Sequence, residues 1–448
     1  MDTIKLPPQV QTALDILNGA GHTAYAVGGC VRDALRGATP HDWDLTTSAL
    51  PQEMQACFAG YHVIETGLQH GTLTVVMDGM PLEITTYRID GKYTDNRRPD
   101  SVTFTVNLRD DLSRRDFTVN AMAYHPSEGI VDLFGGAEDL RFGRIACVGR
   151  AQERFAEDGL RILRALRFSS VLDFSIAEET AEAIHLQKGL LCGISAERIY
   201  AELTKLICGK GAARILREYA DVLFEILPEL RAMYGFDQQN PHHCYDVYEH
   251  TLHVLEAVRP EPILRYSALL HDAGKPAVFT KDERGGHFYG HAKVSAEIAR
   301  QTMHRLKSDR KTMDAVLELV VHHDVVFENP ERGIRRMVNR IGFEQTRRLL
   351  ELHRADVTGQ AEYHRAGRIA ESAEMLAFLD ELERADACLS LEKLAVCGRD
   401  VIALGVPQGR EVGMILQALL EQVMDSALPN EREALLEAVK QGMTREAQ

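Results

Sequence analysis

The sequence predicts an α+β fold in which a small α/β head is followed by an elongated all-α neck, body and tail. Over residues 1–145, short helical patterns alternate with short β-rich runs. Two of these runs, within residues 71–88, are joined by Asp78-Gly79, which is a hairpin signal. From about Gly149 onward, apolar residues recur at helical spacing and β-rich runs are few.

Each element of the head follows from its own local pattern. Apolar spacing predicts helices over residues 10–17 and 31–35, and β-rich runs predict strands over residues 23–27 and 43–46. Changes in pattern farther along the chain predict four parts: head, helical neck, helical body and helical tail. Their predicted bounds are 1–145, 146–235, 236–365 and 366–448.

Composition limits the classes of protein that fit. The 448 residues carry a formal net charge of −15, which argues against nonspecific coating of nucleic acid, because phosphate contacts need clustered Lys and Arg. Arginines do concentrate in RRDF and in EDGLRILRALRF. A local basic cleft in an acidic protein is therefore consistent with the sequence.

The sequence does not predict a membrane protein. No apolar run approaches the ~20 residues that span a bilayer, and the first residues lack a signal-peptide core with a cleavage site. The eight cysteines are scattered and include no CxxC pair, as expected of reduced thiols. We therefore expect a cytoplasmic protein.

The stretch that runs from GGCVRDALRG to DWDLTT carries the first candidate site. Gly28 and Gly29 follow a predicted strand, so backbone N–H groups can approach an anion to which Arg32 adds donors. Asp42 and Asp44, two apart on the next predicted strand, are expected to face the same side. Two adjacent carboxylates need a cation, and Mg²⁺ bridged to phosphates suits them. This combination predicts phosphoryl or nucleotidyl transfer.

The order of motifs resembles the polymerase-beta-type nucleotidyltransferase superfamily, in particular bacterial tRNA nucleotidyltransferases and their poly(A) polymerase relatives. The matching segments are GGCVRDALRG, DWDLTT, RRDFTVNAMAY, DLFGG, EDGLRILRALRF and SAERIYAEL. They cover roughly the first 210 residues. The resemblance implies that Asp42 and Asp44 are the catalytic carboxylates, which bind Mg²⁺ and activate the 3′-hydroxyl of tRNA. Glu83 is a candidate third carboxylate, with an exposed strand position as the alternative.

The same resemblance implies the nucleotide contacts. Asp116 and Asn120 match groups that position the ribose or a loop. For Arg164 and Arg167 a solvated basic helix face is the alternative. The residues implied to contact the nucleotide are Gly29, Arg32, Arg115, Asp158, Arg161, Arg164 and Arg167.

Asp158 and Arg161 carry the predicted choice of base. Three apart on one predicted helix, they are expected to share a face. A carboxylate acceptor beside a guanidinium donor complements the amino group and ring nitrogen of cytosine and adenine, and opposes uracil and guanine. The resemblance implies this templating role, and a surface ion pair worth ~0.3–0.5 kcal/mol is the alternative.

The choice among related activities depends on two segments. The polar stretch at 85–104 resembles the loop of CCA-adding and A-adding relatives, which disfavours CC-only addition. The stretch ETGLQHGTLTVV looks more like tRNA nucleotidyltransferases than like bacterial poly(A) polymerases. We therefore predict addition of C, C and A from CTP and ATP to the 3′ end of tRNA. A-only addition and poly(A) synthesis remain the alternatives.

A second candidate site lies in the predicted body. LLHDAGKP resembles the HD phosphohydrolase signature, and the matching ligands are His250, His271, Asp272 and Asp356. Imidazole and carboxylate suit a divalent transition metal or Mg²⁺. The resemblance implies hydrolysis of a phosphoester, with a helical scaffold for tRNA as the alternative.

The partners expected from these predictions are the tRNA 3′ end, CTP and ATP, with no membrane. A hypothesis from another class is an HD phosphohydrolase whose head binds nucleotide only as a regulator. The oligomeric state is left open between monomer and homodimer.

Overall fold

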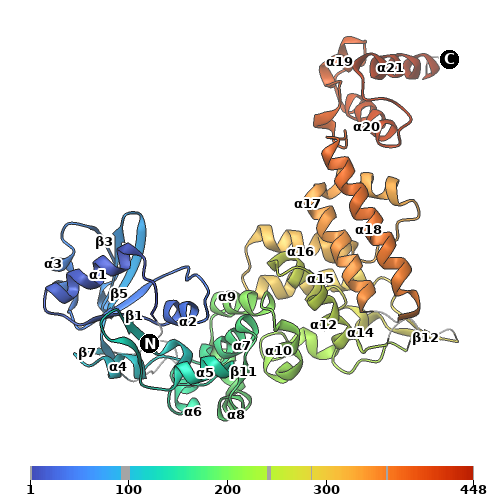
Figure 1. Ribbon diagram of the computed structural model, residues 1–448. Helices are drawn as coiled ribbons and strands as arrows, with labels where there is room; N and C mark the ends of the chain where they lie inside the picture. Colours follow the sequence, from blue (N-terminus) through green and yellow to red (C-terminus); the bar gives the residue numbers. More distant parts are fainter. Residues whose placement is uncertain (1–2, 92–100, 240–243, 284, 360–361, 447–448) are drawn as a thin grey trace. The chain divides into compact units, whose positions relative to one another are not determined.

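The computed structural model describes residues 3–91, 101–239, 244–283, 285–359 and 362–446 (Figure 1). The chain forms two compact units, Met1–Pro228 and Glu229–Gln448. The predicted α+β class is confirmed, because the first unit contains the main sheet and the second is built largely of helices. The finer division into four parts stays a prediction.

The head is built on a seven-stranded sheet in the order β3-β4-β5-β2-β1-β8-β9. Strands β2 and β5 run parallel, and the other neighbouring pairs are antiparallel. The strands are β1 (Ala24–Val27), β2 (Asp44–Thr47), β3 (His62–Gly67), β4 (Thr72–Met77), β5 (Met80–Thr86), β8 (Met122–His125) and β9 (Gly129–Asp132).

The predicted hairpin is confirmed as β4 and β5. Asp78 and Gly79 between them both have positive φ, 49° and 81°, the conformation that a tight two-residue hairpin turn requires. The predicted strand at 43–46 is displaced by one residue, because β2 begins at Asp44. Asp42 therefore lies outside the strand.

The two faces of the sheet have different environments. Helices α1 (Pro8–Gly19) and α3 (Pro51–Cys57) contribute Leu14, Leu17 and Met54 to a core that includes Leu45 of β2. Because side chains alternate along a strand, the neighbours of Leu45 in β2 point to the opposite face. A smaller cluster on that face includes Leu112 of α4 (Leu108–Ser113).

Helices make up most of the rest of the first unit, with two short two-stranded pairings. The strand pairs are β6 (Arg88–Asp90) with β7 (Val102–Phe104), and β10 (Arg144–Ile145) with β11 (Ser175–Ile176). The helices are α2 (Gly29–Leu35), α5 (Gly136–Phe142), α6 (Ala151–Glu157), α7 (Leu160–Leu172), α8 (Glu178–Gln187), α9 (Ala196–Ile207), α10 (Ala212–Glu218) and α11 (Ala220–Leu223).

In the described residues of the second unit, the regular elements are helices and one hairpin, formed by β12 (Thr280–Asp282) and β13 (Gly285–His287). Its long helix α17 is kinked at Gly342, whose φ of 80° and ψ of 168° are open in practice only to glycine. The helices are α12 (Val247–Ala257), α13 (Pro262–Leu270), α14 (Lys275–Val278), α15 (His291–Arg305), α16 (Arg310–His322), α17 (Pro330–Thr358), α18 (Glu362–Arg384), α19 (Gly398–Ala403), α20 (Arg410–Met424) and α21 (Arg432–Glu446).

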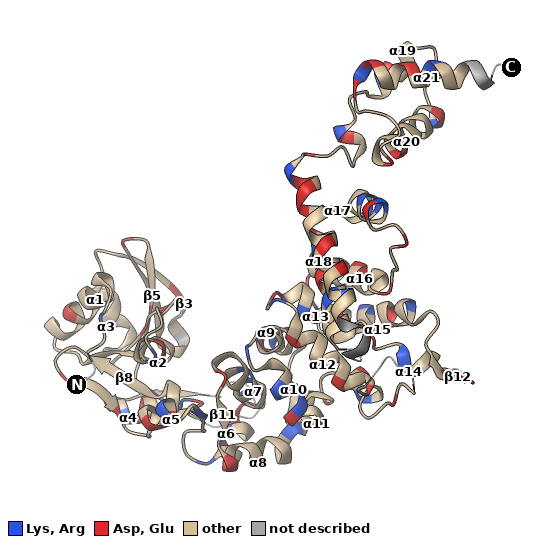
Figure 2. Ribbon diagram, turned by 45° about the vertical axis from the view of Figure 1, so that its right-hand side comes forward, with Lys and Arg blue, Asp and Glu red and all other residues tan. Residues whose placement is uncertain are grey.

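Acidic residues recur along one of the long helices of the second unit. Figure 2 shows acidic positions recurring along α18, in keeping with the net charge of −15. Among the described residues, no helix is both long enough and apolar enough to cross a bilayer.

Candidate active site and candidate metal centre

The glycine pair forms a turn between β1 and α2 that a side chain would disturb. Gly28 has φ 84° and ψ −130°, a conformation that residues with a Cβ rarely adopt. A Cβ at this position would lie 3.0 Å from Nη1 of Arg115. The turn therefore brings backbone and guanidinium groups together, as the prediction of an anion cradle requires.

Carboxylates meet beside this turn. Asp44, the first residue of β2, pairs in register with Glu83 of β5. Burial, together with the charges of Glu83 and Asp42, raises the pKa of Asp44 to about 6, against a lowering by Arg115. Asp42 is exposed and precedes the strand, so its predicted strand position is wrong, although its charge still acts on Asp44.

These carboxylates have the chemistry of a hard-cation site. Burial is the main cause of the raised pKa of Asp44, and repulsion from Glu83 and Asp42 adds to it; a divalent cation would offset that repulsion. Asp42, Asp44 and Glu83 are not among the groups of described residues whose ligand atoms all lie within 4.8 Å of one another. The Glu83 position beside Asp44 supports its candidacy as a third ligand.

A chain of hydrogen bonds links Arg32 of α2 to Arg164 of α7. Arg32 Nη1 donates to Asn120 Oδ1 at 2.7 Å, and Asn120 Nδ2 donates to Asp116 Oδ1 at 3.1 Å. Arg164 Nη2 donates to Asp116 Oδ2 at 2.5 Å. Burial alone would raise the pKa of Asp116, but Arg164 and Asn120 lower it to about 2. Four residues predicted from the motifs therefore form one network.

Arg167 extends this basic region. Its Nε lies 2.6 Å from Glu202 Oε2, and Arg164 Nη1 lies 3.6 Å from Glu202 Oε1. The Arg167 guanidinium stacks on the ring of Phe168 at 3.7 Å from the centroid. With 13% of its side chain exposed, Arg167 does not fit the alternative of a solvated helix face.

Asp158 and Arg161 do not share one continuous helix, so that prediction is wrong. Helix α6 ends at Glu157, and Asp158 has extended backbone angles of φ −143° and ψ 105°. Gly159 then leads into α7 at Leu160. Gly159 itself has ordinary helical angles, and close packing favours the glycine, because a Cβ there would lie 3.0 Å from Cβ of Leu190.

Asp158 and Arg161, which we call the base readers because they are predicted to recognise the base, are each held by other groups. Arg198 Nη2 donates to Asp158 Oδ2 at 2.6 Å, and the N–H of Leu160 donates to Asp158 Oδ1 at 3.1 Å. Arg161 donates to Glu157 Oε2 at 2.5 Å and to the carbonyl of Arg114 at 3.3 Å. Both side chains are thus fixed in orientation, and Arg161 reaches the RRDF segment.

The supporting residues were missed in the sequence. Arg198 and Glu202, which bind Asp158 and the arginines of α7, lie four apart on α9. The SAERIYAEL motif contains both, and their helical spacing was the available signal. For the predicted loop at 85–104, the structure describes the flanking strands β6 and β7, and residues 92–100 lie outside the described part.

The predicted body ligands come together in the second unit. His250 Nε2 lies 2.9 Å from Asp356 Oδ1 and 3.5 Å from Asp272 Oδ2. His271 Nε2 lies 3.3 Å from Asp272 Oδ2 and 3.6 Å from Asp356 Oδ1. Ligand atoms of these four residues all lie within 4.8 Å of one another, although the residues come from α12, α17 and the end of α13.

A second group of ligand atoms shares Asp272. His291 Nε2 lies 3.4 Å from Asp272 Oδ1, and His323 Nε2 lies 3.6 Å from it. Nδ1 of each of the four histidines, His250, His271, His291 and His323, is within 2.7–3.0 Å of a backbone carbonyl. Such bonds orient the Nε2 atoms toward the carboxylates, as in metal centres.

The cluster has unsatisfied polar atoms that a cation would satisfy. His271 Nε2 and Asp272 Oδ2 are fully buried and make no well-directed hydrogen bond within the described structure, although Lys275 Nζ lies 2.7 Å from Asp272 Oδ2 and pairs with its charge. Burial lowers the pKa of His271, but Asp272 and Asp356 outweigh it and raise the value to about 10. The imidazole and carboxylate donors therefore fit a divalent cation.

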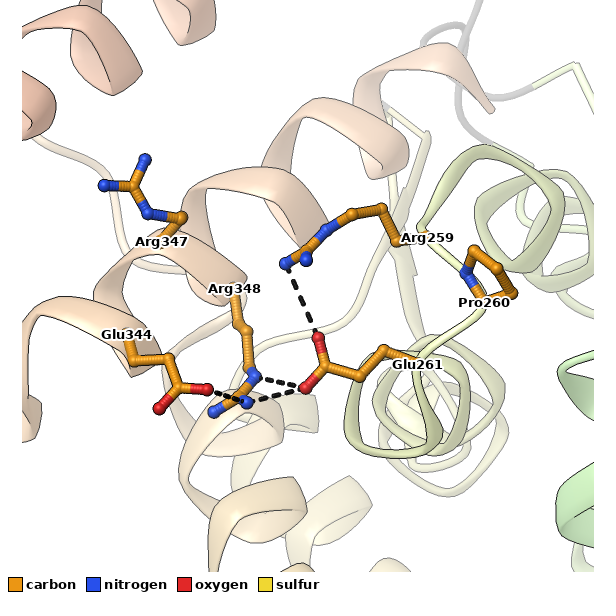
Figure 3. Close-up of a pocket in the computed structure, with 6 residues that line it drawn as sticks. All are labelled: Arg259, Pro260, Glu261, Glu344, Arg347 and Arg348. Atoms are coloured by element: carbon orange, nitrogen blue, oxygen red, sulfur yellow. Dashed lines mark hydrogen bonds and ion pairs between the residues drawn. The ribbon is translucent and has the colours of Figure 1, made fainter.

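A third charged cluster in the second unit is internally neutralised (Figure 3). Arg348 of α17 binds both Glu344 and Glu261, at 2.6 Å in the latter case. Glu261 also lies 3.5 Å from Arg259, whose Nε binds Glu351 at 2.7 Å. Each charged side chain that lines this pocket forms an ion pair with an oppositely charged one. We therefore assign the cluster a structural role.

Comparison with known proteins supplies the family. Residues 24–146 match the Poly A polymerase head domain, and residues 173–233 match a probable RNA and SrmB-binding site of polymerase A. Residues 287–439 match a putative tRNA nucleotidyltransferase domain 2. The CCA-adding enzyme of Geobacillus kaustophilus is 34% identical over 438 residues, 96% of each chain. The chain belongs to the CCA-adding enzyme family.

Other relatives of the family match more strongly over a shorter length. The CCA-adding enzyme of Lactobacillus delbrueckii subsp. bulgaricus is 48% identical over 211 residues, 47% of this chain and 53% of the relative. The chain thus matches about half the length of several curated relatives. The Bacillus stearothermophilus CCA-adding enzyme in complex with CTP aligns with a TM-score of 0.70 and 30% identity, covering 99% of this chain and 100% of that one.

Proposed function

We propose that this member of the family adds C, C and A from CTP and ATP to the tRNA 3′ end without a nucleic-acid template. The observation that carries the proposal is the meeting of Asp44, Glu83 and Arg115 at the glycine turn of the same unit that holds Asp158 and Arg161. The bond from Arg161 to the carbonyl of Arg114 joins the two regions.

The reaction assigns a task to each group. Asp42 and Asp44, with Glu83 beside them, would hold Mg²⁺, which supplies charge stabilisation to the phosphates when bound. Arg115 and Arg32 orient the triphosphate as donors. The tRNA 3′-oxygen loses its proton and forms a bond to the α-phosphorus, while the bond to the β-phosphate oxygen breaks and pyrophosphate leaves.

Base choice is assigned to the two fixed side chains. Asp158 retains acceptor capacity, because each carboxylate oxygen has two acceptor sites and the contacts from Arg198 and Leu160 use one on each. Arg161 presents a guanidinium held by Glu157. Together they complement cytosine and adenine, while uracil and guanine would leave buried polar groups unpaired.

Several relatives, including one that matches over nearly the whole chain, are named CCA-adding enzymes, which favours full CCA addition over the alternatives. The test supplies purified protein with tRNA that lacks its 3′ end and each labelled nucleotide, alone and in mixtures. Ordered addition of C, C and A supports the proposal. Addition of ATP only to tRNA that ends in CC indicates A-only activity, and long A tails indicate poly(A) synthesis.

A second function is proposed for the histidine centre. We infer that His250, His271, Asp272 and Asp356 hold a divalent transition metal or Mg²⁺, with His291 and His323 available for a second ion that shares Asp272. When bound, such an ion would supply activation of a water molecule for attack on a phosphoester. The supporting observations are the convergence of these ligand atoms and the buried His271 Nε2, which makes no well-directed hydrogen bond among the described residues.

The centre is tested by metal content and phosphoester hydrolysis. His271→Ala should lower the bound metal measured by elemental analysis and abolish metal-dependent release of phosphate from a chromogenic phosphomonoester. Addition of CTP to tRNA should continue. Hydrolysis that persists at the wild-type rate in this variant would contradict the assignment, and loss of hydrolysis together with unaltered metal content would contradict the ligand set.

The remaining expectations concern the compartment and assembly. All eight cysteines are free thiols, which fits the expected reducing cytoplasm. Monomer and homodimer both stay open for this chain.

A further inference from the structure

We propose that Asp111, on α4, is a positioning residue for nucleotide binding because its carboxylate fixes Arg115 against the glycine turn and ties it to strand β2. Asp111 is 0% exposed, although neither motif analysis nor the candidate site includes it. The inference rests on the proposed nucleotidyl transfer and adds a residue to it.

The first link is to Arg115. Nη2 of Arg115 lies 3.4 Å from Asp111 Oδ2, while Nη1 of the same guanidinium faces Gly28, 3.0 Å from the place of a Cβ there. Nε of Arg115 is buried and has no hydrogen-bond partner among the described residues. Nη2 of the Arg115 guanidinium is thus anchored by Asp111, while Nη1 faces the glycine turn. Nε is a further buried donor without a partner in the described part of the chain, which leaves it for an anion.

The second link is to the strand that begins with Asp44. Thr46 Oγ1 donates to Asp111 Oδ2 at 3.0 Å, and Thr46 is 0% exposed. Thr46 lies two residues after Asp44 and so shares its face of the sheet. The same carboxylate oxygen therefore contacts both the strand of the metal-binding carboxylate and the arginine assigned to the triphosphate.

The third link leads toward the base readers. Arg114 donates to Asp111 Oδ1 through Nη2 at 2.6 Å and Nε at 3.0 Å. The backbone carbonyl of Arg114 in turn accepts the bond from Arg161. Asp111 thus holds both arginines of the RRDF segment, one facing the triphosphate position and one supporting a base reader.

The charge balance distinguishes this carboxylate from ordinary packing. Asp111 faces two guanidinium groups; because Arg114 is also paired with Asp90 at 3.7 Å, Arg115 is the guanidinium with positive charge left for phosphate. Arg115 and Arg114 hold the pKa of Asp111 below its usual range, against the raising effect of burial, so the carboxylate stays ionised at neutral pH. Asparagine at this position keeps the volume but removes the charge that aligns the fork.

The test compares Asp111→Asn with Asp110→Asn in the full chain. Asp110 is a matched control, because it lies on the same helix and bonds Thr105 at 2.9 Å rather than an arginine. We expect Asp111→Asn to raise the Kd for both tripolyphosphate and CTP about tenfold, the loss typical of one charge-assisted hydrogen bond. Asp110→Asn should stay within about twofold of wild type.

A double-mutant cycle with Arg115→Ala separates positioning from a purely structural role. If Asp111 acts through Arg115, Asp111→Asn adds little to the Kd in the Arg115→Ala background. The proposal is overturned if Asp111→Asn lowers the unfolding midpoint but leaves Kd unchanged. It is also overturned if the increases in Kd caused by Asp111→Asn and Arg115→Ala multiply fully in the double variant. If Asp111→Asn does not fold, Thr46→Val replaces it, with a rise in Kd of about threefold expected for a neutral hydrogen bond.

Tripolyphosphate binding also keeps this inference separate from the proposed activity. If the wild-type protein fails to add CTP to tRNA, the proposed function fails. The Kd comparison then still decides whether Asp111 positions Arg115 for a polyphosphate.

Discussion

Replacing Arg161 with alanine should weaken the preference for CTP and ATP over UTP and GTP without unfolding the head. The Arg161 side chain is 12% exposed and is held by Glu157 at 2.5 Å and by the carbonyl of Arg154 at 3.2 Å. Its removal withdraws a fixed donor that opposes the wrong bases. A buried polar group left unpaired costs ~1–3 kcal/mol, so the selectivity ratio should fall roughly 5- to 150-fold.

The assay is addition of each nucleotide alone to tRNA lacking CCA, with kcat/KM for CTP divided by that for UTP. Arg154→Ala is the matched control, because Arg154 also binds Glu157 at 2.5 Å but is not a predicted reader. Since Glu157 keeps Arg154 as a partner in Arg161→Ala, the free energy of unfolding should fall by no more than ~1 kcal/mol. An unchanged ratio, with CTP addition still measurable, would refute the reasoning about base choice.

Three further predictions test other parts of the two sites. Because the pKa of Asp44 is raised to about 6, its carboxyl is largely protonated at pH 5 and ionised at pH 8, so the rise in Tm caused by Mg²⁺ should be larger at pH 8; an equal rise in Asp44→Asn would contradict this. Gly28→Ala should lower the free energy of unfolding, measured in urea, by ~1–3 kcal/mol, because a φ of 84° strains any residue with a Cβ. As a control, Gly413→Ala in helix α20 should not destabilise the protein, because no atom of the described residues outside the local chain lies within 4 Å of the Cβ position there. Chelation should abolish hydrolysis at the histidine centre, and added divalent metal should restore it in wild type but not in His271→Ala.

The sequence was informative where local pattern and geometry coincide. The Asp78-Gly79 turn was predictable because few other dipeptides adopt two successive positive φ angles. The meeting of the four residues of the histidine centre was predictable from a known signature, although they lie up to 106 residues apart, as between His250 and Asp356. In the head, the fold class was likewise predictable from a resemblance, and residues 24–146 match the Poly A polymerase head domain.

The sequence was least informative about breaks and long-range ion pairs. Apolar periodicity continues on both sides of Asp158 and Gly159, so the helix break at the extended residue Asp158 was not predicted. The partners of Asp158 and Arg167 lie on α9, and no local pattern specifies which carboxylate meets which arginine across helices. Asp111 was missed for the same reason, because its importance depends on Thr46, 65 residues away.

The measurement that tests the central claim most directly is nucleotide addition by wild type and by Asp44→Asn on tRNA lacking its 3′ end, with metal-dependent phosphoester hydrolysis followed in the same samples. We predict ordered addition of C, C and A by the wild type, and loss of addition with unchanged hydrolysis in the variant. Addition at the wild-type rate by Asp44→Asn, or a wild-type protein that adds no nucleotide, would contradict the account.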